Sequence, residues 1–138
     1  SGLDELSKTE ALVNPENLNE IADWMKAELD SYAKMHSGYM GISNLWEVFE
    51  KISKYLSKRL NIPSDKVEIA KIIDEKGETT YPDDSSMGQR KGSLSLMGEE
   101  LFEYTVNSEG MDFSIDAWND ENLKNAIPKL IEYLRNQK

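Results

Sequence analysis

A chain of 138 residues with 38% hydrophobic residues is long enough to bury a core, so we expect one globular domain. Its 16 Lys and Arg against 26 Asp and Glu give a formal net charge of −10, which argues against binding to nucleic acid phosphates or to anionic membranes. The lack of cysteine excludes disulfides and thiolate metal sites, and no apolar run approaches the roughly 20 residues of a membrane span.

The N-terminal part of the chain predicts an arm followed by a helix. Residues 1–13 carry scattered apolar residues and are expected to form a flexible arm or a short helix, whereas residues 14–138 form the domain. Asn14 and Pro15 are favoured at the start of a helix, and apolar residues follow them at helical spacing. Gly38 is a typical helix stop, so the first helix is predicted to end there.

A second helix is predicted from Asn44, because Glu47 three residues later completes a pattern typical of a helix start. A broad apolar stripe continues to Leu60, and Pro63 is expected to end the helix. Since only residues 38–43 separate the two helices, we expect them to pack as an antiparallel pair.

The next segment has features of both a strand and a helix. Residues 67–73 alternate as in a strand, although Ser64 could cap a helix that ends at Gly77. We favour the strand, because β-branched residues are dense and residues 74–77 have the composition of a hairpin turn. Residues 79–81 would then return, and residues 82–92 would form a loop rich in Asp, Ser and Gly.

Two firmer strands follow this loop. Residues 93–106 carry apolar residues whose alternation changes phase near Gly98, which predicts a bulge or a break at that point. A turn over 107–110 leads to residues 111–118, where apolar and polar residues alternate as in a half-buried strand.

The final element is predicted to be one helix that begins at Asn119 or Asp120 and is kinked by Pro128. Its apolar residues form a continuous stripe from Leu123 to Leu134. Together these elements predict an α+β fold with two N-terminal helices, an antiparallel meander of three or four strands, and one C-terminal helix packed on the sheet.

The stretch between Lys91 and Lys124 holds eight Asp and Glu residues and no Lys, Arg or His. Strand alternation is expected to place Asp112 and Asp116 on one face with Trp118, so that carboxylates surround an exposed aromatic ring. Such a face is suited to docking a basic protein, and the candidate partner-binding residues are Glu103, Tyr104, Asp112, Asp116, Trp118 and Asp120. The alternatives are a solvated face that only keeps the protein soluble, and a Trp118 buried against the last helix.

Catalytic and metal-binding motifs are not evident in the sequence. His36 is the only histidine and lies near a predicted helix end, where it needs no catalytic role. Residues 107–112 and 74–78 do not match a calcium-binding EF-hand loop, and residues 83–86 are best read as a surface loop. We therefore expect no enzymatic activity, no metal and no cofactor.

The leading hypothesis is a protein-binding module that occludes a basic protein partner, such as a toxin. A small, acidic, cysteine-free α+β domain without catalytic motifs has the general character of bacterial immunity proteins and antitoxins, which is an analogy of composition alone. The alternatives are a ligand-binding or structural domain of an exported or lipid-anchored protein, and a DNA-mimic inhibitor. We expect a monomer or weak dimer in the cytoplasm; because the chain begins Ser1-Gly2 without Met, an exported protein whose leader has been removed is the alternative.

Overall fold

The computed structural model describes residues 15–35, 38–59, 61–63, 66–81, 88–107 and 112–137, so the predicted arm over 1–13 lies outside the described residues. The helices are α2 (Pro15–Met35), α3 (Gly38–Arg59), α4 (Ile69–Ile72) and α5 (Asp120–Arg135). The strands β1 (Ile73–Thr80), β2 (Gln89–Leu96), β3 (Glu99–Asn107) and β4 (Asp112–Trp118) form one antiparallel sheet in the order β1-β2-β3-β4. The predicted α+β class is confirmed, and the meander has four strands.

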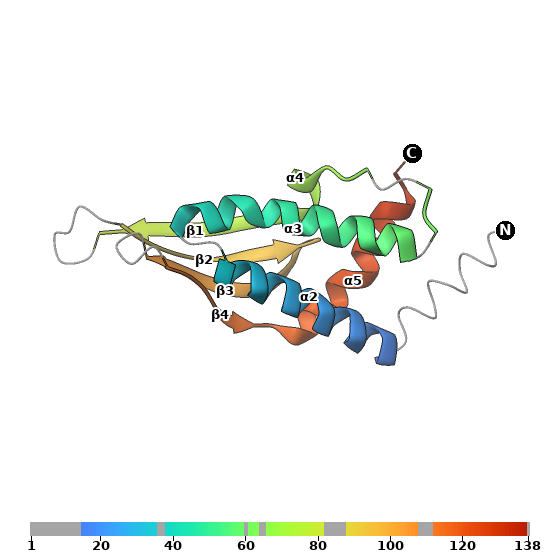
Figure 1. Cartoon of the computed structure of the whole chain (residues 1–138), viewed down its shortest axis with the longest axis horizontal. Coiled ribbons are helices and arrows are strands. Elements are labelled where there is room, and N and C mark those ends of the chain that lie inside the picture. The colour runs from blue at the N-terminus through green and yellow to red at the C-terminus, as the bar shows by residue number, and fades with distance from the viewer. Residues whose placement is uncertain are drawn as a thin grey trace.

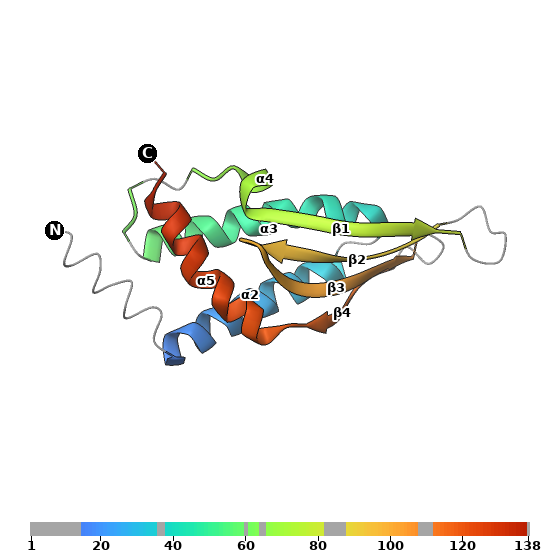
Figure 2. The same ribbon diagram turned by 180° about the vertical axis from the view of Figure 1, so that it is seen from behind.

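The helices lie on one side and at one end of the sheet. α2 and α3 pack side by side as an antiparallel pair over one face, which we call the inner face (Figure 1). α5 follows from β4 and packs against β3 and against both long helices at one end of the sheet (Figure 2). In the same view from behind, no helix of the described chain lies in front of the middle of the sheet.

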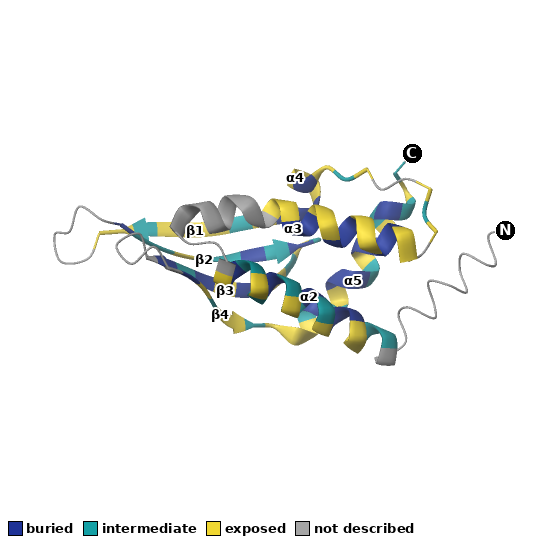
Figure 3. Cartoon of the chain, viewed as in Figure 1, coloured by how far each residue is buried: buried dark blue, intermediate teal, exposed yellow. Residues whose placement is uncertain are grey.

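The hydrophobic core lies between the inner face of the sheet and the helices α2, α3 and α5. Figure 3 shows buried and exposed residues alternating along α2 and α3, as expected for helices with one face on the core. Phe49 and Ile52 of α3, Leu94 and Phe102 of the sheet, and Leu130 of α5 are each at most 2% exposed. Burying one side chain of this size contributes roughly 1.5–3 kcal/mol, so this cluster is the main source of stability.

The start of α3 differs from the prediction. The helix begins at Gly38 rather than at Asn44, so residues 38–43 are helical and do not form a linker. These residues contain no proline, and Ile42 continues the apolar spacing of the helix three residues before Leu45. The predicted antiparallel packing of the two helices is nevertheless confirmed.

A Schellman motif ends α3, and its key residue is Asn61 rather than the predicted Pro63. Asn61 has φ 55° and its N–H donates to the carbonyl of Lys58 at 3.3 Å. The N–H of Ile62 donates to the carbonyl of Ser57 at 2.8 Å. Asparagine tolerates this left-handed conformation, so the chain can leave the helix before the proline is reached.

The strand predicted over 67–73 is wrong. Val67 precedes the single helical turn α4, and β1 begins only at Ile73. Ile69, Ile72 and Ile73 are all buried in the core. Their spacing of three and four residues suits a helical turn. The alternative prediction of a helix ending at Gly77 is wrong as well, because β1 begins at Ile73.

The hairpin turn predicted over 74–77 is also wrong, because these residues lie within β1; Thr79 and Thr80 end the same strand, and Tyr81 follows it. β2 begins at Gln89, inside the predicted loop over 82–92, of which residues 82–87 lie outside the described chain. β1 pairs with β2 along its whole length. Pairing with a neighbouring strand therefore overrides the turn-like local composition.

The break predicted near Gly98 is confirmed, but the single strand predicted over 93–106 is wrong, because the chain reverses at this point into two antiparallel strands. Met97 and Gly98 join β2 to β3, with φ 51° and 82° respectively. Positive φ at both central residues is typical of a two-residue type I′ hairpin, in which the strands keep their natural twist.

The strand predicted over 111–118 and the helix after it are confirmed as β4 and α5. Asn119 caps α5, since its side-chain oxygen accepts a hydrogen bond from the N–H of Asn122 at 3.0 Å. The helix continues through Pro128 to Arg135, so this C-terminal segment is one element, as expected.

A buried hydroxyl on α3 allows a first test of the core. Ser57 is 2% exposed, and its Oγ has no hydrogen-bond partner among the described residues. Because an unsatisfied buried polar group costs free energy, we expect Ser57→Ala to raise the free energy of unfolding by about 0.5–1 kcal/mol. Urea titration measures this change.

In the buried control Ser53, Oγ donates to the carbonyl of Phe49 at 2.8 Å, so Ser53→Ala should bring no gain. Equal effects of the two substitutions would contradict the assignment.

Candidate functional site

The open face is the face of the sheet that α2 and α3 leave uncovered. Directly paired residues lie on the same side of a sheet, so the pairs Lys76–Ser93 and Ser93–Glu103 put three side chains on this face. Its members include Asp74, Lys76, Glu78, Lys91, Ser93, Glu100, Glu103, Thr105, Ser114, Asp116 and Ala117. The charged residues of this list are all exposed, and they comprise five carboxylates and two ammonium groups.

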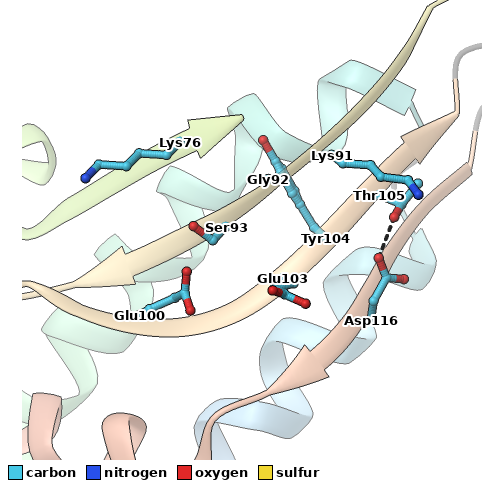
Figure 4. Close-up of a pocket in the computed structure, with 9 residues that line it drawn as sticks. All are labelled: Lys76, Lys91, Gly92, Ser93, Glu100, Glu103, Tyr104, Thr105 and Asp116. Atoms are coloured by element: carbon cyan, nitrogen blue, oxygen red, sulfur yellow. Dashed lines mark hydrogen bonds between the residues drawn. The ribbon is translucent and has the colours of Figure 1, made fainter. Parts of the chain in front are cut away.

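A shallow hollow of about 460 Å³ crosses the open face. The hollow is lined by Lys76, Lys91, Gly92, Ser93, Glu100, Glu103, Tyr104, Thr105 and Asp116 (Figure 4). The two lysines come from β1 and β2, whereas the carboxylates of Glu100, Glu103 and Asp116 come from β3 and β4. The lysines and the carboxylates of the hollow therefore come from different strands.

Asp116 is an extra residue in β4. Glu103 pairs with Ala117 and the next residue of β3 pairs with Ile115, so Asp116 has no partner of its own and forms a β-bulge. Its carboxylate accepts hydrogen bonds from the hydroxyls of Thr105 and Ser114, the latter at 2.9 Å. These two bonds hold Asp116 on the open face.

The bulge moves Trp118 to the inner face, so the expectation that Trp118 shares a face with Asp116 is wrong. One extra residue reverses the alternation of every later side chain in the strand. Trp118 now pairs with Phe102, and the two rings meet edge to face with centroids 5.0 Å apart. The indole N–H of Trp118 donates to Asp30 of α2 at 3.4 Å. Trp118 is thus half-buried, and its indole N–H contacts α2; the alternative prediction had expected it to be buried against the last helix.

Lys26 of α2 forms an ion pair with Asp120, another of the predicted site residues. Its Nζ donates to a carboxylate oxygen of Asp120 at 2.7 Å and lies 5.7 Å from the centre of the Trp118 ring. Asp120 is therefore partly neutralised within the protein. Glu99 is likewise paired, with Lys129 at 2.8 Å.

Tyr104 belongs to the interior and not to the open face. Its side chain is 2% exposed, and its hydroxyl accepts a hydrogen bond from Nε of Arg90 at 3.2 Å. Arg90 also binds both carboxylate oxygens of Glu75, at 3.0 and 3.1 Å. Sequence reasoning missed this cluster, because it had assigned Glu75 to a turn and Arg90 to a loop.

The structure therefore separates the six predicted site residues. Glu103 and Asp116 lie together on the open face, whereas Tyr104 and Trp118 face inward and Asp120 is paired with Lys26. Register places Asp112 beside Asn107 at the start of β4, and its side chain lies outside the described part of the structure. Glu100 joins the group although sequence reasoning had not selected it, and its only signal was its place in the acidic stretch.

Within the described ranges, no group of three His, Asp or Glu residues is placed to hold a metal ion. His36 and residues 83–86 lie outside those ranges. None of the described helices combines the length and the apolar character that crossing a bilayer requires.

Comparisons with protein-family models, with curated proteins and with solved structures find no match for this chain. The geometry of the open face therefore provides the argument for function.

Proposed function

We propose that the open face is a docking surface for a basic protein, and that the protein acts by occluding the surface it binds. The observation that carries this proposal concerns Glu100 and Glu103. Both carboxylates are exposed on a sheet face that no described helix covers, and neither has an ion-pair partner among the described residues. Unpaired carboxylates of this kind are available to a partner's lysines and arginines.

Electrostatics supports a partner of positive charge. A net charge of −10 attracts a basic protein over several ångströms, and the surplus of carboxylates on the open face directs it to this side. The neutral positions of the face are small, as at Ser93, Thr105 and Ala117, so a partner's side chains can approach the sheet closely. Hydrogen bonds already hold the Asp116 carboxylate in place, which lowers the entropy cost of binding.

The charges of the open face favour a basic protein that does not bind nucleic acid over the partner of the DNA-mimic alternative, which would be a nucleic-acid-binding protein. A surface that imitates a phosphate backbone needs carboxylates at regular intervals without opposing charge. Here Lys76 and Lys91 lie among the carboxylates of the hollow.

Charge reversal at Glu103 tests the docking surface. The full chain is used at about 50 mM NaCl to capture proteins from lysate, and the captured partner is purified for kinetics. We expect Glu103→Lys to slow association by about tenfold or more at this salt and by much less at about 500 mM NaCl, because screening weakens steering.

Glu50→Lys is the matched control for this experiment. It makes the same change in net charge at an exposed position of α3, in the layer opposite the open face. Association that is slowed equally by both substitutions would show that only net charge matters. Association that neither substitution affects would overturn the proposal.

A further inference from the structure

β1 is an edge strand whose outer side has no strand beside it in the described part of the chain. It stands at one end of the strand order, as Figure 2 shows, and it pairs with β2 from Ile73 to Thr80 without a bulge. The opposite edge, β4, is interrupted by the bulge at Asp116 and is contacted by α2. Bulges and covering helices hinder the addition of another strand, so β1 is the more open of the two edges.

The hydrogen bonds of the sheet show which residues of β1 direct their backbone outward. The N–H of Met97 donates to the carbonyl of Ile72 at 2.7 Å, so these two residues form a hydrogen-bonded pair beside the end of the ladder. Hydrogen-bonded and non-hydrogen-bonded pairs alternate along an antiparallel ladder, so the even-numbered residues of β1 bond to β2. Glu75, Gly77 and Thr79 therefore point their N–H and C=O groups away from β2, and no described residue bonds to these groups.

The side chains of β1 define the kind of segment that fits this edge. Asp74, Lys76 and Glu78 are exposed on the open face, so charge alternates negative, positive, negative along the strand. Opposite an added antiparallel strand these residues would occupy the non-hydrogen-bonded pairs, in which side chains approach each other most closely. The complement is an extended segment with a basic, an acidic and a basic residue at every second position. Such a segment carries a net positive charge.

We propose that an extended segment of the basic partner adds to β1 as a fifth strand, with the pattern Lys-x-Glu-x-Lys facing Glu78, Lys76 and Asp74. This inference rests on the proposed function and specifies how the partner is held. Backbone hydrogen bonds supply affinity, and the charge pattern supplies specificity. A second copy of this chain is a poorer occupant, because it would bring another net charge of −10 to the edge.

The direct test follows the backbone amides of the ¹⁵N-labelled full chain with acetyl-Thr-Lys-Val-Glu-Val-Lys-Thr-amide. In the free protein we expect the amides of Glu75, Gly77 and Thr79 to exchange with solvent much faster than those of Lys76 and Glu78, which bond to β2. Saturating peptide should slow exchange at the three outward amides by at least about fivefold and leave the other two almost unchanged. Absence of saturable binding, or binding that leaves the outward amides unprotected, would overturn the assignment.

Two N-methylated peptides test the backbone contact. When its Glu lies opposite Lys76, the peptide directs the N–H groups of both Val residues toward β1 and that of Glu away from it. N-methylation of the second Val should therefore weaken binding by at least about tenfold. N-methylation of Glu is the same chemical change on the other side of the peptide, and it should weaken binding far less. Equal losses would show that side chains alone hold the peptide and would contradict strand addition.

Lys76→Glu tests the charge pattern through the direction of its effect. It should weaken binding of this peptide severalfold and strengthen binding of a second peptide with Lys in place of the central Glu, because that residue lies opposite Lys76. A change that acted only through net charge would strengthen both, since both peptides are positive and the protein becomes more negative. Lys34→Glu, the same change at an exposed position of α2, is the control and should weaken neither. Equal effects of the two substitutions would contradict pairing at Lys76.

Strand addition and the proposed function can fail separately. If Glu103→Lys slows partner association but the peptide leaves the outward amides of β1 unprotected, the docking surface stands and strand addition does not. If the peptide adds to β1 but Glu103→Lys leaves partner association unchanged, strand addition stands without the docking function. Protection of the outward amides that grows with protein concentration in the absence of peptide would assign the edge to a second copy of the chain and overturn the proposal.

Discussion

Gly92→Ala is expected to lower the free energy of unfolding by about 2–3 kcal/mol, because the added methyl group has no space. A Cβ at Gly92 would overlap the carbonyl oxygen of Lys76 on β1, and it would lie 2.6 Å from Cα of Gly77 and 2.7 Å from Oη of Tyr104. Two of these three neighbours are backbone atoms of a paired strand, so they cannot move aside without disturbing the sheet. Urea unfolding followed by tryptophan fluorescence measures the loss.

Gly98→Ala is the matched control for this substitution. Gly98 has φ 82°, a conformation that costs an alanine about 1 kcal/mol, but no atom lies within 4 Å of an added Cβ. Gly92→Ala should therefore be clearly the more damaging of the two. Combining it with Tyr104→Phe should recover part of the loss, since this removes one of the overlapping atoms. A Gly92→Ala protein as stable as the Gly98→Ala protein would contradict the close packing of Tyr104 beneath β2.

The C-terminal half of the fold could be predicted because its signals are local. Asn119 caps α5 through a bond to a residue three positions away, and the turn at Gly98 needs only two residues with positive φ. The alternation over 111–118 also depends on neighbours in sequence. In each case the interaction that decides the structure lies within a few residues of the pattern that predicts it.

β1 could not be predicted for the opposite reason. Its polar middle, over 74–77, has the local composition of a turn, and it becomes a strand because every residue pairs with β2. Glu75 gains its partner Arg90 from 15 residues away. Such contacts depend on the tertiary structure, and no local pattern contains them.

The candidate site likewise combines features that local sequence predicts with features that it does not. The exposed side of the Asp116 carboxylate followed from its place among alternating apolar residues, whereas the pattern around Glu103 did not fix the face on which that carboxylate lies. The bulge at Asp116 has no local signal, since a strand with one extra residue has the same composition as a regular strand. That single residue reversed the predicted orientation of Trp118, which packs on Phe102 and contacts α2 on the inner face.

Arg90→Met is expected to lower the free energy of unfolding by about 2 kcal/mol, the second large effect. The substitution keeps much of the aliphatic bulk but removes the donors that Glu75 and Tyr104 share. The Glu75 side chain is only 20% exposed and that of Tyr104 only 2%, so water cannot fully replace the guanidinium. Because the pair retains some solvent contact, the loss should remain below that of a fully buried ion pair.

Lys129→Met provides the comparison, since it removes the partner of Glu99 from a pair in which Lys129 is 51% exposed. We expect it to cost no more than about 0.5 kcal/mol. A double-mutant cycle with Glu75→Leu should show coupling of about 1 kcal/mol between Glu75 and Arg90, because the carboxylate is costly only when its partner is missing. Purely additive effects would mean that Arg90 contributes by packing alone. In that case the inner face would hold Tyr104 without help from the ion pair.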